Sequence, residues 1–337
     1  MTQVDPAYND DMLTVATRPL KRLTRPADPP GFLMTRRHVL IMEALAQYRN
    51  LDANQIARIV GGSPRGVGSN LRSLFWHGYV DRPQGQHVTL AAFFDEGNRP
   101  LVYALTRKGA RFLTDRGHAL EHRLDWTFRR VTPLFLAHTV EVAEVMMRFG
   151  FACRDHGNVR LIDHHELLPQ MPESTRARRD PFKLLVTIQH DRKPLDLAVV
   201  PDRLFTLLSA GSRPSSYALE LDRGSMDINA KRLVGKSSFR KKQIGYFNAR
   251  KQKKHTELWG FDSFRCLTVT TSDARIAKMI KAQREVTGDS ASGFFLYTTR
   301  KRLADHGPFA PVWISSKAQG ISILPPAAAG GARVWRQ

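Results

Sequence analysis

Two short apolar runs, each next to acidic residues, constrain the fold of this chain more than any other stretch. The first, residues 197–200 (LAVV), leads through a proline to Asp202, and the second, residues 217–221 (YALEL), carries Glu220 and is followed by Asp222. Side chains alternate between the two faces of a strand, so Glu220 and Asp222 point the same way. If the two runs pair as a hairpin, Asp202 joins them and three carboxylates converge.

Carboxylates gathered in one place repel one another unless a cation or a shared proton compensates. Mg²⁺ and Mn²⁺ bind carboxylate oxygens and can activate water for phosphoryl transfer. The sequence therefore offers a metal site at these strands, with Mg²⁺ or Mn²⁺ as the cofactor. The alternative is a strand pair with an exposed acidic turn.

The chain of 337 residues, long enough for two domains, carries 52 Lys and Arg against 31 Asp and Glu, a formal net charge of +21. This excess favours a polyanionic partner, and double-stranded DNA is expected before a membrane surface. No apolar run approaches the length of a membrane span, about 18 residues, and the first residues lack a signal-peptide pattern. With only two cysteines there is no disulfide framework, and a cytoplasmic protein is expected.

A small helical domain is predicted over residues 34–116, after a flexible basic arm over residues 1–33. The basic part of the arm is either a phosphate contact or a solvated tail. Caps and apolar spacing predict helices at 35–47, 52–60, from Ser63 or Pro64 onward, and 107–116, with strands at 78–80 and 101–105.

The third of these helices has a polar face of short and basic side chains. Such a face suits base-edge and phosphate contacts in the major groove. Its members are Arg65, Ser69, Asn70 and Arg72, and Arg82 follows in the polar hairpin tip between the two strands. The pattern LRSLFWHGYVDR…VYALTRKGARFL resembles that of bacterial winged helix-turn-helix proteins. The alternative is a small helical domain used for protein contacts.

The second half begins with a connector, residues 117–131, and an amphipathic helix over 133–150. His138, Glu141 and Glu144 of this helix either face the carboxylate site or lie on a solvated surface. The run from Asp163 to Glu166 contains adjacent histidines, which point to opposite faces if they lie on a strand and so chelate a metal poorly.

Residues 231–254 contain many basic residues and no acidic one. A solvated helix face normally mixes both signs, so this segment is predicted to contact phosphates. The expected contacts include Lys236, Arg240 and Lys251. Strands at 265–270 and 294–298 alternate with a helix at 273–285, short strands at 313–314 and 321–324 follow, and residues 326–337 read as a disordered tail.

Six segments taken together resemble the replication-relaxation family of plasmids and integrative elements. They are LAHTVEVAE, PDRLFTL, YALELDRGS, FRKKQIGY, RCLTVTTSDARIAKM and FFLYTT, and they cover about residues 35–324. The resemblance implies a winged helix followed by a PD-(D/E)XK domain, which is restriction-endonuclease-like, over residues 132–325. Some members of this family are mobilisation relaxases or plasmid replication proteins, so the resemblance implies a role of that kind.

The resemblance implies roles for individual residues. Asp202 and Glu220 are the implied metal ligands, and Asp222 stands where the family pattern has a catalytic lysine. The replacement cation would come from Lys241 or Lys242 in the following helix. In that helix Gln243 and Tyr246 resemble a DNA-contacting pair, with a spacing one residue short.

We therefore expect an α/β protein with an N-terminal winged helix-turn-helix and a restriction-endonuclease-like mixed-sheet domain. It is expected to bind DNA of a plasmid or integrative element and to nick one strand with Mg²⁺. The alternative is a non-catalytic transcription or replication regulator with a degenerate nuclease-like domain. Expected partners are double-stranded DNA, other mobilisation or replication proteins, and a second copy of the chain.

Overall fold

The computed structural model describes residues 23–83, 86, 100–118, 132–228, 238–288 and 293–325. Two compact units divide the chain, residues 1–136 and 137–337. Several predictions lie outside the described residues: the first part of the arm, most of the connector, the phosphate contact of Lys236, and the tail at 326–337.

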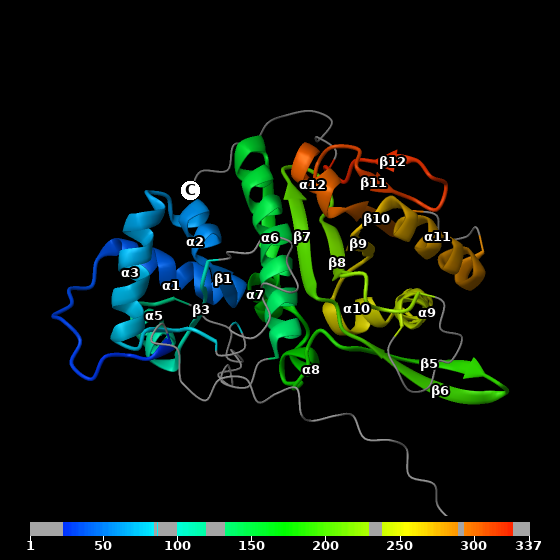
Figure 1. The fold of residues 1–337 in the computed structure, drawn as a ribbon. Helices are drawn as coiled ribbons and strands as arrows, with labels where there is room; N and C mark the ends of the chain where they lie inside the picture. Colours follow the sequence, from blue (N-terminus) through cyan, green and yellow to red (C-terminus); the bar gives the residue numbers. More distant parts are fainter. Residues whose placement is uncertain are drawn as a thin grey trace, which may run out of the picture. The chain divides into compact units, whose positions relative to one another are not determined.

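The N-terminal unit has the element order of a winged helix (Figure 1). In chain order it contains α1 (Arg36–Tyr48), β1 (Asn50–Asp52), α2 (Ala53–Val60), α3 (Pro64–Trp76), β2 (Val80–Asp81), β3 (Val102–Leu105) and α5 (Arg107–Thr114). The three strands form one antiparallel sheet in the order β1-β3-β2.

Side-chain caps explain where these helices begin. Asp52 accepts a hydrogen bond from the Gln55 N–H at the start of α2, and Ser63 caps α3 with proline at its first position. Apolar residues of α1, α2 and α3 fill the core between the helices, among them the fully buried Ile41, Ile56 and Leu71. The predicted helices of this unit are confirmed to within a few residues.

The end of the predicted flexible arm contacts the winged-helix elements. Arg25 donates hydrogen bonds to the Phe75 carbonyl at 2.7 Å and the Val80 carbonyl at 3.1 Å, and forms an ion pair with Asp81 at 3.0 Å. The Phe32 ring stacks on His77, with 4.6 Å between ring centroids. Arg25 therefore joins the end of α3 to β2, and its partners here are groups of the protein itself.

The C-terminal unit is built on a seven-stranded mixed sheet in the order β12-β11-β10-β9-β8-β7-β4. The strands are β4 (Val159–Asp163), β7 (Arg203–Ser209), β8 (Ser215–Leu221), β9 (Arg265–Thr270), β10 (Phe295–Thr299), β11 (Trp313–Ile314) and β12 (Gly320–Ile321). The central strands β8, β9 and β10 are parallel, and the outer pairings are antiparallel. The predicted α/β fold class is confirmed, and the N-terminal helices are compatible with a winged helix.

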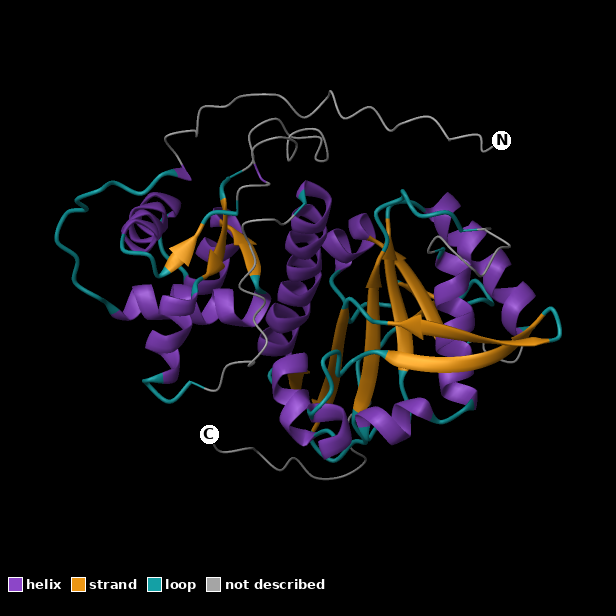
Figure 2. Ribbon diagram, turned by 90° about the horizontal axis from the view of Figure 1, so that it is seen from below, coloured by secondary structure: helices purple, strands orange, loops and turns teal. Residues whose placement is uncertain are grey.

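Helices cover both faces of this sheet (Figures 1 and 2). The helices are α6 (Pro133–His156), α7 (His164–Leu167), η4 (Leu168–Gln170), α8 (Glu173–Arg176), α9 (Phe239–Lys251), α10 (Lys254–Trp259), α11 (Asp273–Thr287) and α12 (Arg300–His306). On one face Ala218 packs in a cluster with Tyr246 of α9 and Met279 of α11. On the other, Phe149 of α6 packs on Phe205, with 4.8 Å between ring centroids.

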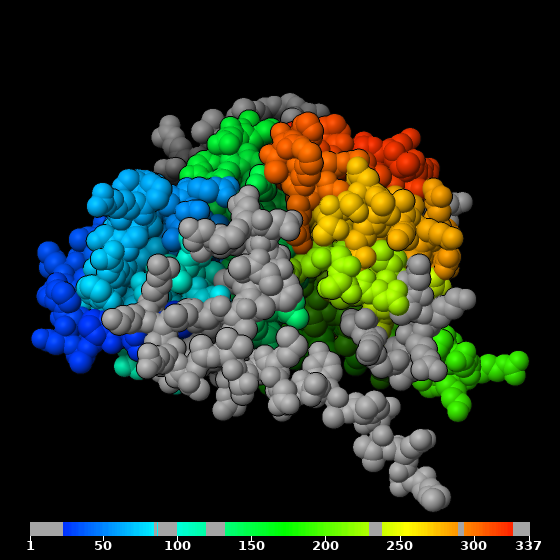
Figure 3. Space-filling view, viewed as in Figure 1, coloured from blue at the N-terminus to red at the C-terminus, as the bar shows by residue number. Residues whose placement is uncertain are grey.

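One strand pairing differs from the prediction. The run at 197–200 does not pair with β8, because it belongs to β6 (Lys193–Val199), which pairs with β5 (Leu184–His190) as a separate hairpin. Figure 3 shows this hairpin projecting from the surface. The partner of β8 is β7, whose apolar sequence RLFTLLS begins directly after Asp202. Proline before Asp202 has no N–H for a ladder, which favours a break between β6 and β7.

We predict that Arg25→Ala loosens the N-terminal unit. The change removes a side chain that binds two backbone carbonyls and Asp81, so it should lower the free energy of unfolding by about 1–3 kcal/mol. Hydrogen exchange of the α3 amides in the full chain should accelerate accordingly. The control is Arg36→Ala, an exposed arginine at the start of α1, which should have little effect. Equal exchange rates in the two variants would contradict the anchoring role.

Candidate active site

Asp202 lies at the start of β7, beside the end of β8. Its N–H donates to the Leu219 carbonyl at 3.0 Å, and its Oδ2 accepts from the Leu221 N–H at 2.7 Å. The other carboxylate oxygen, Oδ1, lies 3.1 Å from His138 Nε2 of α6. The turn before β7 thus brings Asp202 to the carboxyl end of β8 by a route other than the predicted hairpin.

Glu220 lies on β8 and faces α9, and it is almost completely buried. Two side chains from successive turns of α9 bind its carboxylate. Lys242 Nζ donates to Oε2, and the Tyr246 hydroxyl donates to Oε1 at 2.5 Å. Lys241 and Lys242 were the two candidates for the cation that replaces the lysine of the family pattern. The structure places Lys242, and not Lys241, at Glu220. Lys241 has no acidic partner among the described residues.

The Lys242 ammonium therefore pairs with buried Glu220 and acts on the half-buried Asp202 only through its charge. Burial raises the pKa of Glu220, Lys242 opposes this, and neighbouring Asp202 adds to it, so the pKa lies at about 7. Burial also favours a raised pKa for Asp202, but His138 and Lys242 outweigh it and the pKa is lowered. For Lys242, burial favours a lower pKa, but Glu220 and Asp202 raise it above its ordinary value. Two carboxylates thus stand beside a single lysine ammonium, and the raised pKa of Glu220 brings its protonation close to neutral pH.

Asp222 is not the third member of this group, which corrects the prediction of three converging carboxylates. Its oxygens accept from Arg275 Nε, from Arg275 Nη2 at 2.8 Å and from the Thr270 hydroxyl at 2.6 Å. Glu220 and Asp222 follow the predicted alternation, but Asp222 lies past the end of β8, where the first turn of α11 supplies Arg275. Asp222 therefore holds α11 to the ends of β8 and β9.

Two further predictions about α9 are wrong. Gln243 and Tyr246 were expected to contact DNA, but each side chain is about 1% exposed. Gln243 donates to the Met279 carbonyl and to the Tyr297 hydroxyl, at 3.0 and 2.9 Å. Both residues face the sheet, so they hold α9 in place.

The basic side chains of α9 are less available to phosphates than their number indicates. Arg240 forms an ion pair with Glu285 of α11, and Lys242 is bound to Glu220. Lys251 is exposed, with its ammonium 5.1 Å from the centroid of the Phe247 ring. The segment contains no acidic residue of its own, but acidic residues distant in sequence, such as Glu285, pair with some of its basic side chains.

The predicted reading face of α3 is partly available. Arg65, Ser69 and Arg72 are exposed, and their spacing places them along one side of the helix. Asn70 is half-buried, and its amide donates to the Gly66 carbonyl at 2.8 Å, so it is a poorer candidate for reading bases. Arg82 packs over the Phe75 ring at 4.1 Å from the centroid and is also only partly exposed.

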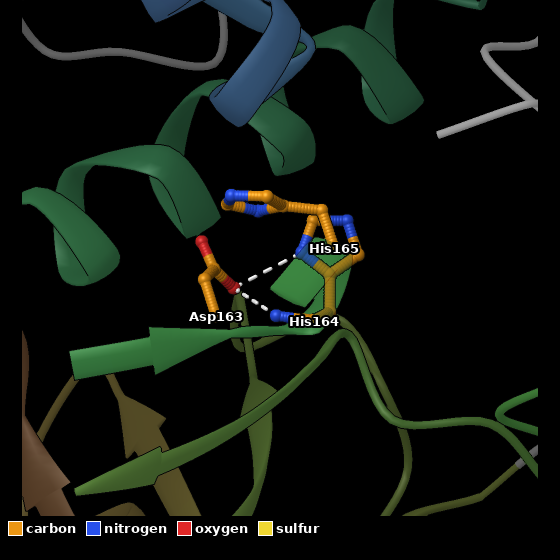
Figure 4. Close-up of side chains that lie close together, drawn as sticks. All are labelled: Asp163, His164 and His165. Carbon is orange, nitrogen blue, oxygen red and sulfur yellow. Dashed lines mark hydrogen bonds and ion pairs between the residues drawn. The ribbon is translucent and has the colours of Figure 1, made fainter. Parts of the chain in front are cut away.

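A second polar cluster lies where β4 ends (Figure 4). The ligand atoms of Asp163, His164 and His165 lie within 4.8 Å of one another, a spacing suitable for a metal. However, Arg203 lies 3.4 Å from Asp163 and 2.8 Å from His164, so a cation already occupies this position. Burial favours a raised pKa for Asp163, but Arg203 and His164 outweigh it and the pKa is lowered. The cluster is best explained as a buried ion pair joining β4 to β7.

Sequence reasoning did not assign Arg275, and it gave Tyr246 a DNA contact in place of its hydrogen bond to Glu220. Their partners are distant in sequence, and only the packing of α9 and α11 on one face of the sheet brings them to Asp222 and Glu220. The four-residue spacing of Lys242 and Tyr246 was the available signal, because it places both on one face of a helix.

Among the described residues, no helix is long and apolar enough to cross a membrane. Neither curated proteins nor solved structures give a match to the chain. A family model described as Replication-relaxation matches residues 42–255, which is more than half of the chain. Membership implies a role in the replication or mobilisation of a plasmid or related element. The chain belongs to the Replication-relaxation family.

Proposed function

We propose that this protein binds DNA of a plasmid or integrative element and nicks one strand at Asp202 and Glu220 with Mg²⁺. The observation that carries the proposal is the ion pair between Lys242 and Glu220 beside Asp202. It gives two carboxylates and a lysine in one place, although the residue at the usual lysine position is Asp222.

The DNA contact is supported by the net charge of +21 and by the exposed basic side of α3. In a winged helix this helix enters the major groove. Arg65 and Arg72 are then the side chains with the length and donors to read guanine.

The donor set fits a hard divalent ion. Asp202 and Glu220 would hold Mg²⁺, because they offer carboxylate oxygens beside a single lysine. When bound, the ion supplies a Lewis acid at the phosphoryl group and a water of lowered pKa.

The protein's own residues have separate tasks around this pair. Lys242, whose raised pKa keeps it charged, stabilises negative charge that develops on the phosphoryl oxygens. Tyr246 fixes the orientation of Glu220, and His138 and the Leu221 N–H fix Asp202. A position held by several hydrogen bonds needs little rearrangement during the reaction.

A specific observation also favours the second candidate, a non-catalytic DNA-binding regulator. Asp222 is engaged in a structural network with Arg275 and Thr270, and Lys242 already satisfies Glu220. In a regulator this network would serve only to stabilise the fold.

We predict that Asp202→Asn and Glu220→Gln abolish Mg²⁺-dependent nicking of a supercoiled plasmid carrying the native locus. Both variants remove a negative charge, so DNA affinity should stay equal or rise slightly. Lys242→Ala should slow nicking by about 10²-fold or more, because it removes a preorganised charge. The matched control, Lys241→Ala, removes the same charge one residue away and should act only through DNA affinity. Nicking that persists in Asp202→Asn would contradict the role given to Asp202, and the absence of nicking in the wild type would favour the regulator.

We further predict that Arg65→Ala and Arg72→Ala weaken binding to the native site by about 1–3 kcal/mol and weaken binding to random DNA less. Asn70→Ala should have a smaller effect, because the Asn70 amide is bound to the Gly66 carbonyl. Fluorescence anisotropy with both DNAs at fixed salt measures the difference. Equal losses on both DNAs would mean that the two arginines contact only phosphates.

A further inference from the structure

Glu141 lies one turn of α6 beyond His138, with its carboxylate between two guanidinium groups. Arg223 Nε is 3.3 Å from Oε1, and Arg300 Nη2 is 2.6 Å from Oε2. Arg223 follows the end of β8, and Arg300 is the first residue of α12, directly after β10. Three elements distant in sequence therefore bring these side chains together.

The charges of this group do not balance. Two arginines face one carboxylate, so a net charge of +1 remains on the three side chains. Glu141 and Arg223 are 12% and 15% exposed, whereas the Arg300 side chain is 39% exposed and reaches the surface. By contrast, Arg302 of the same helix forms an ion pair with Asp273 and is 34% exposed.

The Arg300 guanidinium is held against Glu141 by an ion pair. Its Nε and Nη2 are buried and, among the described residues, make no hydrogen bond of good geometry, so the 39% exposure of the side chain comes from its other atoms. A guanidinium has five donors and matches the oxygens of a phosphate with two parallel bonds. Because one carboxylate faces two guanidinium groups, the three side chains keep a positive charge, and the exposed part of Arg300 brings that charge to the surface.

This cationic group lies beside the acidic pair. His138, which binds Asp202, is three residues from Glu141, a rise of about 4.5 Å along α6. Arg223 comes two residues after Leu221, whose N–H also binds Asp202. The group and the acidic pair thus share the edge of the sheet where β8 and β10 end, the edge where ligands bind in open α/β sheets.

We propose that Arg223 and Arg300, oriented by Glu141, form a subsite for a backbone phosphate of the DNA strand next to the phosphate at Asp202 and Glu220. The subsite rests on the proposed function, because it assumes that the C-terminal unit receives DNA. Glu141 keeps both guanidinium groups in place before DNA arrives, which reduces the entropy lost on binding. The remaining positive charge attracts the phosphate.

The test compares Arg300→Gln with Arg302→Gln in the full-length protein, using a short fluorescein-labelled DNA duplex. Arg300→Gln leaves Glu141 paired with Arg223, so no buried charge is left uncompensated and the fold should hold. It should weaken binding about tenfold and reduce the slope of log affinity against log salt by about 1. Arg300→Lys, which keeps the charge, should restore most of the slope. The control, Arg302→Gln, should leave both quantities close to the wild type.

Equal salt slopes for Arg300→Gln, Arg302→Gln and the wild type would overturn the subsite, whatever the nicking assay gives. A wild type that does not nick plasmid but shows the Arg300-dependent slope would overturn the cleavage proposal and retain the subsite. Far-ultraviolet circular dichroism of each variant identifies any loss that comes from misfolding. If Arg300→Gln fails to fold, the test rests on Arg300→Lys. This variant keeps the positive charge, so its salt slope should stay close to that of the wild type. A slope lower by about 1 would contradict the proposal.

Discussion

The contact between Lys242 and Glu220 is the interaction on which the candidate site depends. Glu220 is buried on a central strand, and an unpaired carboxylate there would be costly. The ammonium from α9 supplies the pairing charge, and Tyr246 one turn later completes the hydrogen bonding. Asp202 lies near the same ammonium and is itself paired with His138.

The polar side of α6 arranges the surroundings of this pair. His138 binds Asp202, and one turn later Glu141 binds Arg223 and Arg300. A single rigid helix thus fixes an acidic centre and a basic neighbour at about one helical turn from each other. Under the proposed function, the carboxylates would face a metal ion and the neighbouring guanidinium groups would face a phosphate of the DNA backbone.

Local signals in the sequence predicted part of this arrangement. Caps such as Ser63 and the apolar spacing of α3 were sufficient for the N-terminal helices, because these features act within a few residues. The pairing of β7 with β8 was missed, since the run at 197–200 and the sequence after Asp202 are both apolar and compete for the same partner. Glu220 contacts α9 and Asp222 contacts α11, and this difference gives them separate roles. It arises from how the two helices pack on the sheet, which the sequence alone does not show.

The most direct test of the account is calorimetric titration of Mn²⁺ into the full-length protein bound to duplex DNA. If Lys242 leaves the pair of Asp202 and Glu220 only partly neutralised, the wild type should bind the ion, and Asp202→Asn should lose this binding. Lys241→Ala should bind Mn²⁺ as the wild type does, because Lys241 does not contact the pair. Absence of Mn²⁺ binding by the wild type, or equal binding by Asp202→Asn, would contradict the account.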